Sequence, residues 1–155
     1  MTKIKEGLKA PVFKGKDQDG RMVSLEDFIG KKVILYFYPK DDTPGCTAEA
    51  CNIRDNYGLL LSKGFAIVGV SPDDEKSHIR FREKYKLPFS LIADPDKSII
   101  KAYGAWGEKS MYGKKYEGVL RTTFVIDEKG IILKIISKVE TRDHTRQILD
   151  ELGIY

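Results

Sequence analysis

The stretch VILYFYPKDDTPGCTAEAC, from Val33 to Cys51, contains the features that decide the fold and the chemistry of this chain. Its first part, Val33 to Tyr38, is an uninterrupted run of β-branched and aromatic residues, which is typical of a buried strand. Pro39 ends the run, and a short polar loop follows. Thr43 then predicts a helix N-cap, with Pro44 at the first helical position, where a missing backbone N–H costs nothing.

Cys46 falls in the first turn of the helix that this pattern predicts. The free backbone N–H groups of that turn and the positive end of the helix dipole point towards its sulfur. This environment favours the thiolate, which is the reactive form of cysteine. We therefore interpret Cys46 as a nucleophile. The alternative, a buried inert thiol, is weaker here because Thr-Pro-Gly before the cysteine is helix-start chemistry rather than core filling.

Cys51 follows five residues later, on the same predicted helix, and makes a redox pair possible. In an intact helix the two Cα atoms lie roughly 8–9 Å apart. A disulfide needs Cα atoms within roughly 4.4–6.8 Å, so the first turns must unwind if the pair is to close. We therefore expect order through Cys46–Cys51 in the reduced form and local unfolding in the oxidised form. A buried structural thiol remains the alternative for Cys51.

A zinc site is a second alternative for the cysteines. Their spacing is not C-x-x-C, and the only histidines are His78 and His144. We expect both histidines on solvated helix faces, and we expect neither a metal nor a cofactor.

Composition predicts one soluble domain. A chain of 155 residues can bury about two-thirds of its unfolded surface. Its 27 basic and 23 acidic residues are mixed along the chain, so nucleic acid is a weak prediction. The apolar runs are far shorter than a membrane span, and the start MTKIKEGLKAP lacks the apolar stretch of a signal peptide. Two cysteines are too few for a secreted disulfide scaffold, which favours the cytoplasm.

The rest of the chain alternates predicted strands and helices without a visible linker. The predicted elements are strands at 11–13 and 22–24 with a turn at Asp19-Gly20, a short helix from Ser24 to Gly30, a helix from Thr43 to about Lys63, a strand at Phe65–Val70, a helix capped within 71–74, a strand at Ser90–Ala93, a helix from Asp94-Pro95 to about Gly104, strands at Thr122–Ile126 and Ile131–Ile136, and a last helix from about Thr141. This order predicts an α/β fold: a mixed central sheet with helices on both faces and an N-terminal β-hairpin. The nucleophile then lies at the carboxyl end of a parallel strand.

The segment Pro39 to Thr47, PKDDTPGCT, resembles the active-site loop of the peroxiredoxins, with its P-x-x-x-T-x-x-C pattern. The segments WGEK from Trp106, YGK from Tyr112 and RTTF from Arg121 resemble the bacterioferritin comigratory protein, or peroxiredoxin Q, branch. The resemblance covers essentially the whole chain. It implies one thioredoxin-like domain over residues 1–155 and a thiol peroxidase activity.

The resemblance also implies roles for single residues. Cys46 matches the peroxidatic cysteine, which attacks a peroxide oxygen and becomes a sulfenic acid. Thr43 matches the hydroxyl partner of the sulfur and the peroxide, and Pro39 the residue that packs over the site. Arg121 matches the guanidinium beside the thiolate. Cys51 matches the resolving cysteine of members that keep both thiols on one helix.

Two further expectations concern the surroundings of this site. Glu49, one turn after Cys46, could hold Arg121 by a charge-assisted pair; the alternative is a solvated helix charge. Residues Trp106–Tyr116 are interpreted as a loop near the pocket mouth whose aromatic residues serve packing.

The resemblance implies a peroxide substrate, hydrogen peroxide or an organic hydroperoxide, and recycling by thioredoxin or a similar dithiol. It also favours a monomer. Two other functions stay open on the residues alone. A thiol–disulfide oxidoreductase would share the layout but normally needs C-x-x-C. A redox sensor would be oxidised without turning over.

Overall fold

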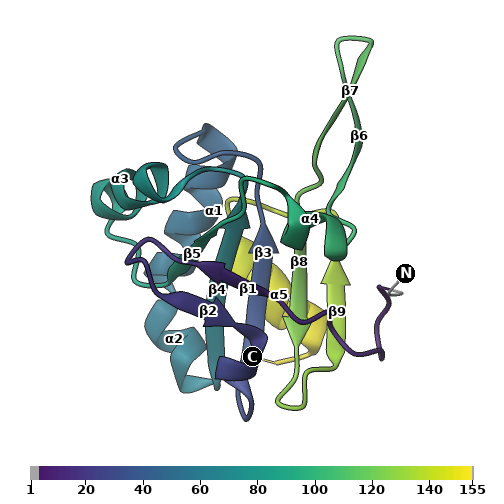
Figure 1. Cartoon of the computed structure of the whole chain (residues 1–155). Coiled ribbons are helices and arrows are strands. Elements are labelled where there is room, and N and C mark those ends of the chain that lie inside the picture. Colours follow the sequence, from purple (N-terminus) through teal and green to yellow (C-terminus); the bar gives the residue numbers. More distant parts are fainter. Residues whose placement is uncertain (1–3, 155) are drawn as a thin grey trace.

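The structure is a computed structural model that describes residues 4–154, so the first three residues of the N-terminal segment and the last residue of the predicted domain lie outside it. Strands and helices alternate along the chain much as predicted (Figure 1). The elements are β1 (Lys14–Lys16), β2 (Met22–Ser24), the 3-10 helix η1 (Leu25–Phe28), β3 (Lys32–Phe37), α1 (Pro44–Asp55), α2 (Tyr57–Ser62), β4 (Phe65–Ser71), α3 (Glu75–Tyr85), β5 (Ser90–Ala93), α4 (Ser98–Ala102), β6 (Trp106–Met111), β7 (Lys114–Val119), β8 (Thr122–Ile126), β9 (Ile132–Ile136) and α5 (His144–Leu152).

The central sheet has five strands in the order β5-β4-β3-β8-β9. Strands β3, β4 and β5 are parallel, whereas β8 and β9 are antiparallel to their neighbours. The predicted mixed α/β sheet is therefore confirmed. The crossovers between the parallel strands contain helices, as parallel pairing requires. Because β3 leads directly into α1, the predicted nucleophile does lie at the carboxyl end of a parallel strand.

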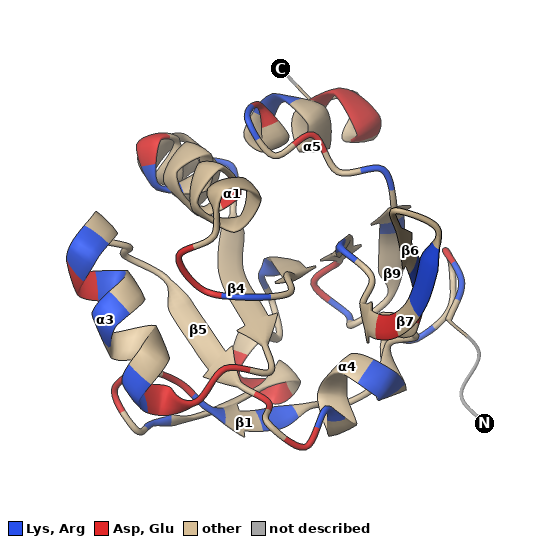
Figure 2. Ribbon diagram, turned by 90° about the horizontal axis from the view of Figure 1, so that it is seen from above, with Lys and Arg blue, Asp and Glu red and all other residues tan. Residues whose placement is uncertain are grey.

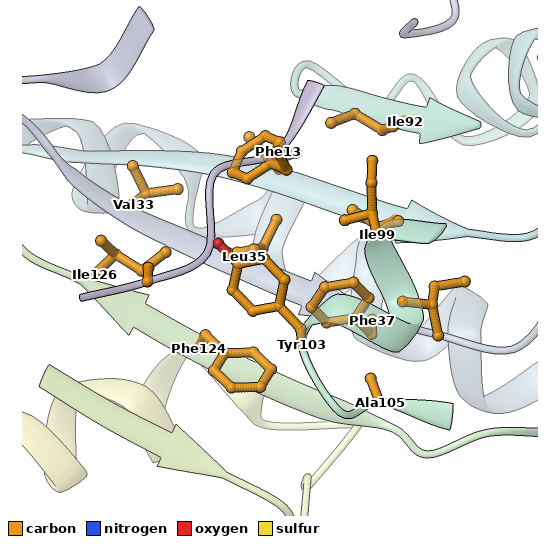
Figure 3. Close-up of a cluster of buried hydrophobic side chains, with 14 of the residues drawn as sticks. Phe13, Val33, Leu35, Phe37, Ile92, Ile99, Tyr103, Ala105, Phe124 and Ile126 are labelled. Carbon is orange, nitrogen blue, oxygen red and sulfur yellow. The ribbon is translucent and has the colours of Figure 1, made fainter. Parts of the chain in front are cut away.

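The side chains of β3 alternate between two buried clusters, one on each face of the sheet. Val33, Leu35 and Phe37 pack against α4 and the N-terminal hairpin, in the cluster drawn in Figure 3. Ile34 and Tyr36 pack on the opposite face, against α1, α2, α3 and α5. Figure 2 shows α1 and α5 on one side of the sheet and α4 with β1 on the other. The prediction of helices on both faces is confirmed.

Several predicted boundaries are wrong by a few residues; the helix predicted from Asp94-Pro95, for example, begins at Ser98. The helix predicted to reach Lys63 breaks at Asn56, which separates α1 from α2. The first strand of the N-terminal hairpin is Lys14–Lys16 rather than 11–13, because the turn centred on Asp19-Gly20 pairs Lys16 with Met22. The last helix begins at His144, three residues after the predicted start.

The segment predicted as a loop at Trp106–Tyr116 is instead the antiparallel hairpin β6–β7, which projects from the body of the molecule (Figure 1). Its turn places Tyr112 at φ 53° and leaves this side chain 98% exposed. Most of the hairpin is solvated on both sides, so its sequence lacks the apolar–polar alternation by which a strand is recognised.

Candidate active site

Cys46 lies in the first turn of α1, as predicted, and its side chain is only 1% exposed. The guanidinium of Arg121 reaches it from the connection between β7 and β8. Arg121 Nη2 donates to Cys46 Sγ over 3.3 Å, and Nη1 donates to Glu49 Oε1 over 2.8 Å. The two ends of one planar cation thus contact the thiol and a carboxylate on successive turns of one helix. The predicted Glu49–Arg121 pair is confirmed.

Gly45 makes this close approach possible. A Cβ at this position would lie 3.2 Å from Arg121 Nη2, tighter than most contacts that a methyl group makes. The glycine that looked like a simple helix-start residue therefore leaves room for the guanidinium over the first turn of α1.

Glu49 is completely buried, and its second oxygen faces α5. Glu49 Oε2 lies 3.5 Å from Nε2 of His144 and has no hydrogen-bond partner among the described residues. His144 is also completely buried; its Nε2 lies 2.7 Å from Thr123 Oγ1, and its Nδ1 lies 2.9 Å from Gln147 Oε1. The expectation of a solvated His144 is wrong, because its partners come from β8 and α5 and enclose it.

Burial changes the acidity of both groups in opposite directions. It raises the pKa of Glu49 to about 7, although the charge and hydrogen bond of Arg121 act the other way. Burial lowers the pKa of His144 to about 4, with Gln147 acting against it and the Arg121 charge adding to it. Near neutral pH the pair therefore lies close to a change of protonation.

The loop before α1 is tied to α3 through a second buried carboxylate, Asp41. Its oxygens accept from Tyr38 Oη over 2.6 Å and from Ser77 Oγ over 2.7 Å, and Oδ2 lies 2.6 Å from Nδ1 of His78. His78 Nε2 lies 3.0 Å from the carbonyl of Ile92. The expected solvated face for His78 is wrong as well, since this side chain has no exposed surface.

The neighbouring residues of the loop are more exposed than Asp41. Asp42 adopts φ 56° and binds Lys84 Nζ and Tyr85 Oη at the surface, over 2.7 and 2.6 Å. Thr43 occupies the predicted N-cap position, but its hydroxyl donates to the carbonyl of Lys40 over 2.9 Å rather than capping the helix. Pro39 lies two residues after the end of β3 and is half-buried.

Cys51 lies one and a half turns after Cys46 on the continuous helix α1, and both cysteines are free thiols. It is half-buried, and burial raises its pKa.

The cysteines and histidines do not converge on one point. Within residues 4–154 the one group of three potential metal ligands consists of Asp41, Asp73 and His78, and hydrogen bonds of Asp41 to Asp73 and to His78 already engage them.

Sequence reasoning missed the buried partners that His144, Asp41 and His78 make. No local signal could have found them, since Glu49 and His144 are 95 positions apart and Asp41 and His78 are 37 apart. A histidine in a polar helix does not reveal which partners the fold will bring to it.

The Cys46 thiol is shielded from bulk solvent and lies against a permanent cation. This arrangement suits attack on a small polar electrophile that contains a weak bond. Fold and site together define the class of thiol peroxidases. Residues 7–135 match the model of the AhpC/TSA family, and the chain belongs to this family of peroxiredoxins.

The relatives narrow the branch to the bacterioferritin comigratory proteins, or peroxiredoxins Q. The chain is 48% identical to the putative peroxiredoxin bcp of Coxiella burnetii, over 96% of this chain and 99% of the relative. It is 43% identical to the peroxiredoxin Bcp of Bacillus subtilis, over 96% and 95%. Among solved structures, Xanthomonas campestris peroxiredoxin Q is 33% identical with a TM-score of 0.85, covering 91% of this chain and 90% of that one. A mutant of Xylella fastidiosa PrxQ is 27% identical with a TM-score of 0.90, covering 99% and 98%.

Proposed function

We propose that this thiol peroxidase works through a two-cysteine cycle on α1. The Cys46 thiolate attacks one oxygen of a hydroperoxide, ROOH, and with one proton gives Cys46 sulfenic acid and the alcohol ROH. The Cys51 thiol then condenses with the sulfenic acid, which forms a disulfide and releases water. A dithiol reductant restores both thiols and is itself oxidised to a disulfide.

The observation that carries the proposal is the fork of Arg121 between Cys46 and Glu49. Its charge stabilises the thiolate before the reaction. Its planar N–H donors can also hydrogen-bond to the leaving oxygen as negative charge develops there. Since Glu49 holds one end of the guanidinium, the other end is oriented before peroxide arrives. In this cycle Thr43 offers its hydroxyl lone pairs to the peroxide O–H, because its own proton is donated to Lys40. Pro39 shields the site from water.

Resolution by Cys51 requires a change of shape. In the intact helix the two Cα atoms are roughly 8–9 Å apart, too far for a disulfide. The turn between them carries Glu49 and Ala50, both completely buried, so unwinding must lift these side chains out of their contacts. Burial also raises the pKa of Cys51, and opening of the helix relieves this burial and so favours the reactive thiolate.

Family membership supports the choice of substrate and reductant. Alkyl peroxide reduction activity is ascribed to the Xanthomonas campestris bacterioferritin comigratory protein, whose solved structure is 33% identical to this chain with a TM-score of 0.84. We extend this to organic hydroperoxides and hydrogen peroxide here, with a thioredoxin-type dithiol as reductant.

Mass spectrometry with peptide mapping, after one equivalent of hydrogen peroxide, tests the cycle. We expect a loss of two hydrogens and a Cys46–Cys51 link. Cys51→Ser should keep the first oxidation, stop at the sulfenic acid and lose turnover with thioredoxin and its reductase. Unmodified thiols in the folded protein would overturn the proposal. Amide hydrogen exchange across 43–53 tests the unwinding, and equal protection in both redox states would contradict it.

Other expectations remain predictions: one domain over the whole chain, a monomer, a cytoplasmic location and no binding to nucleic acid. Sedimentation velocity in both redox states checks the monomer. In residues 4–154 no helix is long and apolar enough to cross a membrane.

A further inference from the structure

The hydrogen bonds around His144 determine which ring nitrogen carries a proton. The side-chain amide of Gln147 has a defined orientation, because its Nε2 donates to the carbonyl of Lys138 over 2.7 Å and its Oε1 accepts from the backbone N–H of Glu140 over 2.9 Å. Oε1 is thus an acceptor, and His144 Nδ1, 2.9 Å away, must be the donor. In its neutral form His144 therefore presents a lone pair on Nε2.

This lone pair faces Thr123 and Glu49. Thr123 Oγ1, at 2.7 Å, can donate to it. Glu49 Oε2, at 3.5 Å, has nothing to donate when ionised and accepts from no other described group. A completely buried carboxylate oxygen is thus left opposite a nitrogen lone pair, which is an unfavourable arrangement. One proton, on Glu49 Oε2 or on His144 Nε2, removes the mismatch.

We propose that His144 is a positioning residue for the peroxidase reaction: it shares one proton with Glu49 and thereby controls how much of the Arg121 charge is available to Cys46. The inference rests on the proposed function, since it deepens the role of the same arginine.

The titratable and charged groups that face Glu49 come from four elements: Cys46 on its own helix, Arg121 from the β7–β8 connection, His144 from α5 and Tyr36 from β3. Tyr36 is completely buried, and its pKa is raised well above the usual value, first by burial and then by the charge of Glu49. It stays protonated over the working range. The raised pKa of Glu49, about 7, places the loss of the shared proton near neutrality.

The proton changes the charge balance around Arg121 without changing its contacts. With the proton present, Glu49 Oε1 still accepts from Arg121 Nη1, so the guanidinium keeps its position while its charge is compensated by the thiolate alone. Without the proton, two anions share one cation, and the charge available to the thiolate and the leaving oxygen falls. The reaction of Cys46 with peroxide should therefore slow on the alkaline side.

The test is the second-order rate constant for single-turnover oxidation of Cys46 by hydrogen peroxide between pH 5 and 9, in reduced protein. We expect an alkaline decline centred near pH 7 and of about tenfold, the size of a coupling of one pK unit. Glu49→Gln keeps an acceptor for Arg121 and a donor for His144 but cannot ionise, so its alkaline decline should disappear. His144→Phe removes the proton acceptor and should move the decline.

Asn52→Ala is the matched control. Asn52 Oδ1 accepts from the backbone N–H of Thr145 over 2.8 Å, so this variant loosens the same α1–α5 contact without touching the proton pair. Its alkaline decline should keep the wild-type midpoint. If His144→Phe does not fold, ¹⁵N NMR of the wild-type imidazole decides the matter: we expect Nδ1–H throughout and a change at Nε2 near pH 7.

The outcomes separate the two proposals. No oxidation of Cys46 at any pH would overturn the proposed function. Oxidation without an alkaline decline, or with one that persists unchanged in Glu49→Gln, would overturn the shared proton alone. A displaced midpoint in Asn52→Ala would assign the effect to helix packing rather than to His144.

Discussion

Two buried histidine–carboxylate pairs flank the start of α1, and they differ in how completely their hydrogen bonds are satisfied. In the pair Asp41–His78, both carboxylate oxygens accept hydrogen bonds, and both ring nitrogens face acceptors. In the pair Glu49–His144, one carboxylate oxygen has no partner among the described residues, and the ring nitrogen nearest to it lies 3.5 Å away.

The two pairs therefore have different roles: one fixes the backbone, and the other can change its charge. In the pair Asp41–His78 both carboxylate oxygens and both ring nitrogens have a hydrogen-bond partner, and this satisfied buried pair ties the loop 39–43 to α3. In the pair Glu49–His144, the ionised Glu49 Oε2 and the neutral His144 Nε2 are both acceptors, and neither has a proton to donate to the other. The first pair holds the backbone before Cys46, whereas the second can change charge beside Arg121 without moving it.

The largest expected effect comes from breaking the satisfied pair. His78→Leu leaves the buried Asp41 carboxylate and the Ile92 carbonyl without their imidazole partner, and breaking a buried pair in this way typically costs about 3–5 kcal/mol of the free energy of unfolding. His144→Leu removes only neutral hydrogen bonds and should cost about 1–3 kcal/mol. Urea denaturation of the reduced proteins at pH 7 measures both. Equal losses, or a larger loss for His144, would contradict the distinction between the two pairs.

Arg121→Lys tests the guanidinium whose charge is partly compensated by the second pair, Glu49–His144. Lysine keeps the charge but loses the fork that joins Cys46 to Glu49. We expect the rate constant for peroxide to fall by about 100-fold, the usual loss for one preorganised donor, while the fold is retained. Stopped-flow oxidation of the reduced protein gives the rate, and circular dichroism is the control. Unchanged kinetics would remove Arg121 from the mechanism.

The pH dependence of stability sharpens the contrast further. Burial raises the pKa of Glu49 from 4.5 to about 7, so its stabilising contribution is lost as the pH rises from 4.5 through 7. Burial lowers the pKa of His144 from 6.5 to about 4, so its contribution is lost as the pH falls from 6.5 through 4. Between pH 4.5 and 6.5 the two effects oppose each other, since the folded and unfolded pairs each hold one proton.

Relative to wild type, Glu49→Gln should therefore gain stability as the pH rises over this window, by up to about 3 kcal/mol. His144→Phe should lose stability with rising pH. Urea denaturation at half-unit steps of pH, taken as the difference from wild type, cancels the other titrating groups. Two flat difference curves would show that the pair does not titrate as described.

The smallest effect is expected at Gly45. A methyl group there would lie 3.2 Å from Arg121 Nη2, so the guanidinium must shift by a few tenths of an ångström. We expect Gly45→Ala to slow peroxide reduction by about threefold to tenfold without lowering stability, since alanine is the better helix former. Gly58→Ala in α2, where a Cβ meets nothing within 4 Å, is the control. A loss of stability without a change in rate would contradict this expectation.

How far the sequence predicts the structure depends on how many positions along the chain separate the interacting residues. The strand Val33–Tyr38 and the Thr-Pro-Gly helix start are local patterns, and both predictions are confirmed to within a residue. The carboxylates that face His78 and His144 are contributed by distant segments, and the burial of these histidines could not be predicted from helix periodicity. The hairpin β6–β7 was missed for the opposite reason, because its mostly solvated faces leave no apolar pattern.

The site shows the same division. Cys46 and Arg121 were predicted from a motif, and the Glu49 pair from a spacing of one turn. The break at Asn56 had a local signal, since Asn56 and Gly58 are both poor helix formers. No pattern in the chain indicated that one oxygen of Glu49 would be left without a partner among residues 4–154.

The bond from Asn52 to the N-terminus of α5 has a consequence for the order of folding. Asp143, the N-cap of α5, makes no side-chain cap of its own, and the free N–H of Thr145 is bound instead by a residue of α1, 93 positions earlier. A helix of nine residues is marginal in isolation. We therefore expect α5 to dock late, onto α1 that has already formed, with φ-values near zero in α5.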